Sequence, residues 1–276
     1  MTRNLTLAER HAYETEGVAH IPEAVDPSWV ERMLAVAERQ LAAPSKWAND
    51  GNPGADRNRN FTDRYMWREN SEIGAFIRDS GCARLAAQAM ASRGARFYFD
   101  HLLIKEPRTA APTPWHQDIP YWPFMGQQIC SIWLALTPCT MENSSLEFVR
   151  GSHLDGKYYA PEAFNGPDDG NVAWMAEAVG DKCPDIEADR DSYDIVGFDV
   201  EAGDALVFSA WVVHAARGNT ASESRRAALS TRWLGDDAVW YPHPGADPTV
   251  KAEDVTVAPG EPPTDNAVFP ELWRDA

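Results

Sequence analysis

The sequence has few basic residues for its length. Only 25 of its 276 residues are Lys or Arg, against 42 that are Asp or Glu, so the formal net charge is −17. A surface this acidic repels phosphate backbones and anionic lipid headgroups. We therefore expect neither nucleic acid nor a membrane surface as a partner, and the oligomeric state stays open.

Long apolar runs and paired cysteine motifs are also missing. The longest apolar run, residues 205–216, is too short and too interrupted to span a bilayer, and the N-terminal segment lacks the charged-then-apolar pattern of a signal peptide. The cysteines show no CxxC spacing, which favours free thiols over disulfides or a zinc site. They are Cys82, Cys130, Cys139 and Cys183. These features predict a cytoplasmic protein.

Helical patterns occupy the first third of the chain, and strand patterns follow. Thr6 and Glu9 predict a capping box at the start of a first helix, and Asp26 with Pro27 predicts the start of a second, amphipathic helix. From Arg96 onward, short segments rich in β-branched and aromatic residues are bounded by Pro, Gly and Asn. The candidate strands are 96–104, 114–119, 128–137, 146–151, 193–200, 204–208, 211–218 and 225–235.

This order of segments predicts a mainly β fold with flanking α-helices, in which two facing antiparallel sheets form a cupin-like jelly roll. We expect one domain over the whole chain. Its parts are an N-terminal helical cover at 1–95, a jelly-roll core at 96–235 with an insert at 152–192, and a C-terminal tail at 236–276.

A metal site is predicted from three residues in two of these strands. His116 and Asp118 lie two residues apart in 114–119, so both side chains leave the same face of a strand. His214 lies in the apolar segment WVVHAA, where a buried imidazole needs a partner. Two imidazoles and one carboxylate leave three positions of a metal ion open, as in iron(II) oxygenases.

The HxD spacing alone does not decide the matter, because it also arises by chance in a chain with 7 histidines. His153 and Asp155 share the spacing, but they follow Gly151 and Ser152 in a predicted turn, without a strand to align them. On pattern alone, structural roles for all these histidines stay open.

Four segments around these residues resemble the phytanoyl-CoA dioxygenase family. They are DHLLIKEP, TPWHQD, ENSSLEFVRGSH and GDALVFSAWVVHAARGNTASESRRAALS, in that order. The resemblance implies a double-stranded β-helix core and an iron(II) and 2-oxoglutarate-dependent oxygenase whose metal ligands map onto His116, Asp118 and His214. The family's co-substrate arginine maps onto Arg225, so that Arg226 faces the other way. An arginine suits this role because its planar fork pairs a carboxylate through two parallel bonds.

The resemblance also implies further positions around the co-substrate. For 2-oxoglutarate these are Trp133, Gln117, Leu102 and Lys105, although Trp133 could equally be a core residue. Near the substrate, the aromatic residues Tyr121, Trp122 and Trp211 surround the ligand segments, yet an ordinary β core also contains such residues.

The function implied is a dioxygenase that uses Fe(II), 2-oxoglutarate and O2, hydroxylates a C–H bond of a small organic molecule and releases succinate and carbon dioxide. Two alternatives remain at this point: a cupin-like metalloenzyme that does not use 2-oxoglutarate, and a non-catalytic jelly-roll binding module that uses its tryptophans. The net charge of −17 argues against an acyl-CoA substrate.

Overall fold

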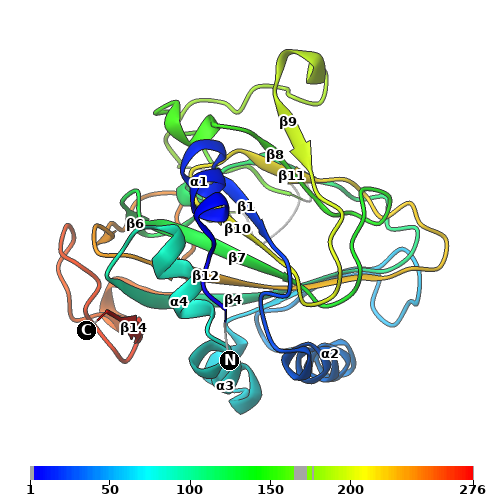
Figure 1. The fold of residues 1–276 in the computed structure, drawn as a ribbon, viewed down its shortest axis with the longest axis horizontal. Coiled ribbons are helices and arrows are strands. Elements are labelled where there is room, and N and C mark those ends of the chain that lie inside the picture. The colour runs from blue at the N-terminus through cyan, green and yellow to red at the C-terminus, as the bar shows by residue number, and fades with distance from the viewer. Residues whose placement is uncertain (1–2, 165–172, 176, 276) are drawn as a thin grey trace.

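Two antiparallel sheets face each other, and helices cover the outer side of the larger one (Figure 1). The computed structural model describes residues 3–164, 173–175 and 177–275. Residues 165–172 and 176, which belong to the predicted insert, lie outside the described residues. The predicted jelly roll of two facing sheets is confirmed.

The larger sheet has eight strands in the described residues, in the order β1-β10-β7-β12-β4-β3-β2, with β14 also paired to β4. Four of them, β4, β7, β10 and β12, coincide with predicted strands. Strands β1, β2 and β3 come from the region predicted as a helical cover, and β14 comes from the tail. Their bounds are β1 (Val18–Ile21), β2 (Asn49–Gly51), β3 (Asn60–Arg64), β4 (Gly94–Lys105), β7 (Ile129–Ala135), β10 (Ala205–Ser209), β12 (Arg226–Leu234) and β14 (Glu271–Arg274).

The smaller sheet has the order β5-β11-β8-β9, and it contains the other four predicted strands. A separate pair is formed by β6 and β13. Their bounds are β5 (Thr113–His116), β6 (Phe124–Met125), β8 (Leu146–Val149), β9 (Ile195–Gly197), β11 (His214–Ala216) and β13 (Val239–Trp240).

The main helices are α1 (Leu7–Glu16), α2 (Pro27–Ala42), α3 (Ser71–Asp79) and α4 (Cys82–Ala89). The capping box predicted for the first helix is present, since Thr6 and Glu9 bond each other's backbone N–H groups. Figure 1 shows α2 and α3 on the side of the larger sheet that faces away from β8, β9 and β11. Short 3-10 turns are η1 (Met66–Arg68), η2 (Ile119–Tyr121), η3 (Ser152–Leu154), η4 (Ala173–Met175), η5 (Arg190–Ser192) and η6 (Ala252–Asp254).

Side chains alternate between the two faces of the larger sheet, as a pleated strand requires. On β12, Ala227 and Leu229 pack with residues of α2, α3 and α4 in the outer core, whereas Ala228 packs between the sheets. On β7, Trp133 also packs between the sheets. The space between the sheets is therefore lined by every second residue of β7 and β12.

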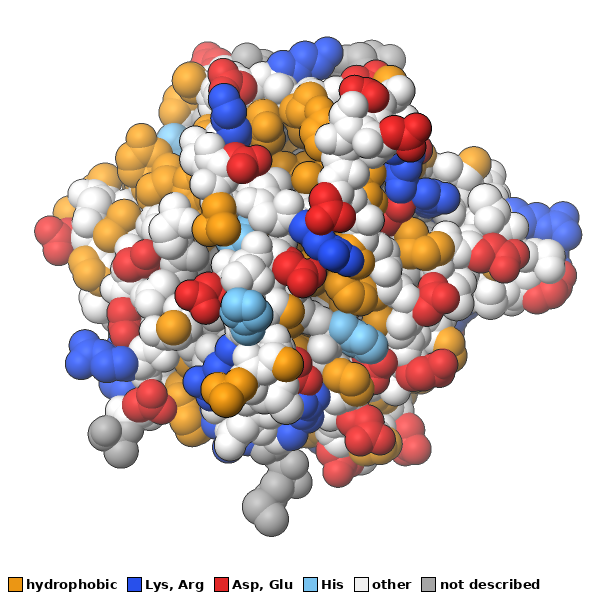
Figure 2. All heavy atoms as spheres, turned by 45° about the horizontal axis from the view of Figure 1, so that its top comes forward, with side chains coloured by type: hydrophobic (Ala, Val, Ile, Leu, Met, Phe, Trp, Pro, Cys, Tyr) orange, Lys and Arg blue, Asp and Glu red, His pale blue; other side chains and the backbone are white. Residues whose placement is uncertain are grey.

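The surface and the cysteines agree with the composition. Figure 2 shows acidic side chains spread over one face of the molecule, with no large gathering of basic side chains. All four cysteines are unpaired, as predicted. Within the described ranges, no helix combines the length and the apolar character needed to cross a membrane.

Candidate metal centre

Two neighbouring strands of the smaller sheet bring the two predicted histidine ligands together. His116 on β5 and His214 on β11 lie directly opposite each other in the antiparallel register, and their ring centroids are 4.2 Å apart. The sequence predicted that Asp118 lies on the same strand as His116, but it does not. The strand β5 ends at His116, and Asp118 has helical dihedral angles (φ −74°, ψ −37°) at the start of η2.

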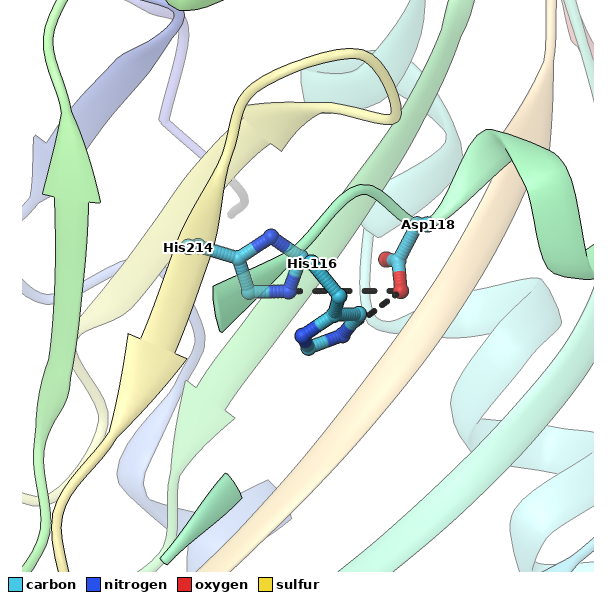
Figure 3. A group of neighbouring side chains, drawn as sticks. All are labelled: His116, Asp118 and His214. Atoms are coloured by element: carbon cyan, nitrogen blue, oxygen red, sulfur yellow. Dashed lines mark ion pairs between the residues drawn. The ribbon is translucent and has the colours of Figure 1, made fainter. Parts of the chain in front are cut away.

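This turn directs the Asp118 carboxylate toward both imidazoles (Figure 3). Its Oδ1 atom lies 3.7 Å from Nε2 of His116 and 3.9 Å from Nε2 of His214. One ligand atom from each of the three residues lies within 4.8 Å of the others, and the described residues contain no other such group of three. All three side chains are buried.

Backbone carbonyls fix the orientation of both imidazoles. Nδ1 of His116 lies 2.8 Å from the carbonyl oxygen of Pro114, and Nδ1 of His214 lies 3.1 Å from that of Val212. A carbonyl only accepts, so Nδ1 carries the proton in each ring and the Nε2 lone pairs face the centre. Metal-binding histidines are usually held in this way.

The charge states also suit a metal. Burial, together with the nearby His116, lowers the pKa of His214 to about 3, so its imidazole is neutral at neutral pH. Burial opposes ionisation of Asp118, but the positive charge of Arg232 and the imidazole partners hold its pKa below the ordinary value. Neutral imidazoles and an ionised carboxylate are the forms that bind a metal.

The donor set fits iron(II). Two imidazole nitrogens and one carboxylate oxygen on one side of an ion form the facial arrangement of non-haem iron oxygenases, and no thiolate that would favour zinc belongs to the group. The alternative pair, His153 and Asp155, is not part of it. Nε2 of His153 instead lies 3.1 Å from the backbone carbonyl of Glu14.

The structure reverses the predicted orientations of two consecutive arginines. Arg225 precedes β12 and points outward, where its guanidinium pairs with Glu106 at 2.7 Å and with Glu38 of α2. Arg226 is the first residue of β12. It is two residues from the inward-facing Ala228, so its side chain leaves the same face of the strand. Its side chain is buried, and its guanidinium lies 5.8 Å from the ring of Trp133. The prediction that Arg225 faces the interior and Arg226 faces away is therefore wrong.

With this geometry established, comparison with known proteins identifies the chain. The profile of the family described as Phytanoyl-CoA dioxygenase (PhyH) matches residues 13–227. This chain belongs to the phytanoyl-CoA dioxygenase family. It is an iron- and 2-oxoglutarate-dependent dioxygenase.

Relatives of this dioxygenase include one curated enzyme and two solved structures. The chain is 23% identical over 231 residues to the multifunctional dioxygenase prhA of Penicillium brasilianum, covering 79% of this chain and 69% of prhA. The non-heme alpha-ketoglutarate-dependent epimerase SnoN of nogalamycin biosynthesis has a TM-score of 0.72 and 23% identity, over 98% of this chain and 96% of SnoN. The carbocyclase SnoK of the same biosynthesis has a TM-score of 0.73 and 22% identity, over 97% and 96%. SnoN is also known in complex with Fe3+, alpha ketoglutarate and nogalamycin RO.

Two further predicted co-substrate residues of the dioxygenase face the space between the sheets, and one does not. Lys105 on β4 lies opposite Arg226 in the β4–β12 register, and Trp133 on β7 lies opposite Ser230 of β12, with its ring 5.8 Å from the guanidinium of Arg226. Leu102 packs in the outer core against the helices, because it is an odd number of residues from Lys105 on the same strand. The structure thus does not bring Leu102 to the interior.

Gln117 holds the insert in place instead of facing the interior. Its amide nitrogen donates to the carbonyls of Lys157 and Trp211, at 3.0 and 2.8 Å, and its amide oxygen accepts from the backbone N–H of Tyr159 at 3.0 Å. The amide is thereby occupied by backbone groups.

The three aromatic residues predicted near the substrate have different surroundings. Tyr121 lines a cleft beside His116, with its ring centroid 5.7 Å from the imidazole. Trp122 is buried in an aromatic cluster, and Trp211 packs in the same cluster with its indole N–H donating to the carbonyl of Gly126. Only Tyr121 of these three lines the cleft.

Several residues at the site were missed from the sequence. Phe164 of the insert lies with its ring centroid 4.7 Å from that of His116. Ser131 donates a hydrogen bond to Asp118, and Arg232 lies nearby. Ser131, Arg226 and Arg232 all occupy alternate positions on β7 and β12, so correct strand parity could have revealed them.

Proposed function

We propose that His116, Asp118 and His214 hold the iron of this dioxygenase, and that Arg226 anchors the far carboxylate of 2-oxoglutarate. The observation that carries the second assignment is the burial of an incompletely paired cation. Arg226 is 3% exposed, its Nε atom has no hydrogen-bond partner, and no carboxylate of the described residues lies within ion-pair distance of it.

Other polar groups on the interior face support a bound dicarboxylate. Lys105, opposite Arg226, is 2% exposed, and within the described residues its ammonium bonds only the carbonyl of Arg217 at 2.9 Å. Burial and the adjacent Arg226 hold the pKa of Lys105 well below its ordinary value. Nε2 of His101 and Oγ of Ser230 are also buried, with no hydrogen-bond partner in the part of the chain that the structure describes. Such groups are costly to bury unless a ligand pairs with them, so the residues present fit 2-oxoglutarate.

The protein's own residues then have separate tasks. Bound iron and 2-oxoglutarate, with dioxygen, supply the oxidation of a substrate C–H bond coupled to release of succinate and carbon dioxide. The triad orients the metal, while Arg226 and Lys105 fix the far end of the co-substrate. The aromatic residues Tyr121 and Phe164 beside His116 limit access of water.

We propose hydroxylation of a small organic molecule that enters through the cleft beside His116. The ring of Tyr121 and the ring of Phe164, 5.5 Å apart, favour a substrate with an apolar surface. The net charge of −17 disfavours a coenzyme A ester, which carries several phosphate charges.

An anaerobic titration tests these assignments. Iron(II) followed by 2-oxoglutarate should give the wild-type protein a weak visible absorption band from the iron chelate, and His116→Ala should give none. The two neighbouring arginines provide a matched comparison, because Arg226→Met removes the buried cation and Arg225→Met removes an outward one. We expect Arg226→Met to weaken 2-oxoglutarate binding by about 100-fold, the value of a charge-assisted pair of about 3 kcal/mol.

In the same titration, Arg225→Met should bind 2-oxoglutarate as the wild type does. If Arg225→Met loses the co-substrate while Arg226→Met keeps it, the assignment of Arg226 is wrong. If the wild type binds iron but never forms the band, the proposed co-substrate site as a whole fails.

A further inference from the structure

The two oxygen atoms of Asp118 have different surroundings. Oδ1 faces the imidazoles of His116 and His214, at 3.7 and 3.9 Å. Oδ2 faces the larger sheet, where it accepts a hydrogen bond of 2.8 Å from Oγ of Ser131 and lies 4.0 Å from Nε of Arg232. The carboxylate thus has one oxygen turned to the metal position and one turned to the protein.

Ser131 bonds this oxygen and Arg232 approaches it as an ion-pair partner, because the two residues lie directly opposite each other on neighbouring strands. The β7–β12 register pairs Arg232 with Ser131, and both residues occupy inward positions. They belong to the larger sheet, whereas His116 and His214 belong to the smaller one. The position of Asp118 therefore depends on both sheets.

The guanidinium of Arg232 is confined. It is 7% exposed and lies 5.1 Å from the ring of Phe99 and 5.8 Å from that of Trp122. Asp118 supplies the only carboxylate of the described residues within ion-pair distance of it. Arg232 is six residues from Arg226 on the same strand, which places their Cα atoms about 20 Å apart. Its guanidinium lies beside Asp118.

We propose that Ser131 and Arg232 are positioning residues that hold Oδ2 of Asp118 and so restrict this carboxylate to one metal bond through Oδ1. A carboxylate that binds through both oxygens occupies two positions of the ion, and the second would come from the three positions that the facial triad leaves free. The pair thereby keeps open the positions that the co-substrate and dioxygen need. This inference rests on the proposed metal triad.

Cobalt(II) in place of iron(II), without 2-oxoglutarate, tests the proposal directly. The visible absorption of bound Co(II) changes with its coordination number, so it reports whether Asp118 binds through one oxygen or two, independently of turnover. The variants are Ser131→Ala, which removes only the hydroxyl, and Arg232→Lys, which keeps the charge. The control is Ser92→Ala, because Ser92 is a buried serine that bonds the backbone of Gly94 and Asp236.

We expect Ser131→Ala to change the Co(II) spectrum and to raise the Kd for 2-oxoglutarate of the metal-loaded protein about 10-fold, in the range typical of residues that support metal ligands. Arg232→Lys should show a smaller change of the same kind, and Ser92→Ala none. Wild-type spectra and wild-type 2-oxoglutarate affinity in both Ser131→Ala and Arg232→Lys would overturn the proposal. A wild-type protein that binds no Co(II) or iron(II) would instead refute the triad on which the proposal rests.

Discussion

Asp100 is a buried carboxyl on β4 that the proposed site does not use. Its two oxygens accept the backbone N–H groups of Met66 and Trp67, at 3.0 and 2.9 Å, at the start of η1. Burial raises the pKa of Asp100 to about 7, although the two N–H groups oppose this shift. The side chain therefore connects β4 to the segment that leads into α3. Its ionisation while buried costs free energy, so its contribution to stability depends on pH.

The raised pKa of Asp100 predicts how the stability of the fold changes with pH. Between its unfolded pKa of about 3.9 and its folded pKa of about 7, Asp100 binds more protons in the folded state, so its contribution to stability falls as pH rises through this range. From pH 5.5 to pH 8 the loss is about 2 kcal/mol. Asp100→Asn should remove this dependence and lower stability at pH 5.5, because its NH2 group faces a backbone donor.

Urea unfolding of both proteins at the two pH values measures the effect. The wild type should lose stability from pH 5.5 to pH 8 relative to Asp100→Asn. Equal losses of stability in the wild type and in Asp100→Asn would show that a group other than Asp100 titrates in this range.

Residue types were easier to predict from the sequence than residue orientations. The triad could be predicted because two imidazoles and a carboxylate are a restricted set of ligands. The orientation of Arg225 and Arg226 depends on the alternation of side chains between the two faces of a strand. A β-bulge shifts this alternation by one residue. The β5–β11 register shifts between His214 and Ala216, and a loop then leads to β12. The mapping of the family's arginine onto Arg225 counts eleven residues along the sequence from His214, and such a count does not detect this shift.

At the scale of elements, the insert between β8 and β9 is attached to the core at a few polar points. Gln117 holds the backbone of Lys157 and Tyr159 through its amide. Farther along, the buried Glu147 of β8 pairs with Arg190 of η5 at 2.5 Å and with Arg217 at 3.0 Å. The bonds of Gln117 lie on the stretch of the insert that leads to Phe164, whose ring lies beside His116, so they support the cleft without contacting the metal position.

We expect Gln117→Ala to loosen residues 157–164 and to leave iron and 2-oxoglutarate affinity unchanged. The variant loses three hydrogen bonds, each worth about 1 kcal/mol. Hydrogen exchange should become faster in 157–164, and the KM for the organic substrate should rise while the KM for 2-oxoglutarate stays constant. A selective rise in the KM for 2-oxoglutarate would restore the role predicted for Gln117 from the sequence.

The predicted strands and the missed strands differ in length and composition. All eight predicted segments contain a strand, because β4, β7 and β12 have seven residues or more and are rich in apolar and aromatic residues, and the shorter ones are bounded by turn residues. The missed β2 has the sequence NDG, and β1 has only four residues. Strands this short carry no periodic signal, and β1 pairs with β10, which is distant in the sequence.

For the whole molecule, the proposed site lies at the junction of the two sheets. The metal ligands come from β5, β11 and the turn after β5, while Ser131, Arg226 and Arg232 come from β7 and β12. A ligand held by both sheets is bound only when they are packed together. Metal and co-substrate binding should therefore stabilise the entire fold.

Calorimetry under nitrogen measures this stabilisation. At a free iron(II) concentration 100 times its Kd, binding to the folded state alone adds about 2.7 kcal/mol, which raises the Tm of a chain of this size by several degrees, on the order of 5–10 °C. Removing iron with a chelator should reverse the shift, and His116→Ala should show none. Adding 2-oxoglutarate to the iron-loaded protein should raise the Tm again in the wild type and in Arg225→Met, but far less in Arg226→Met, because only Arg226 faces the interior. If His116→Ala keeps the full iron-dependent shift, the metal binds elsewhere, and the two sheets are not joined through this triad.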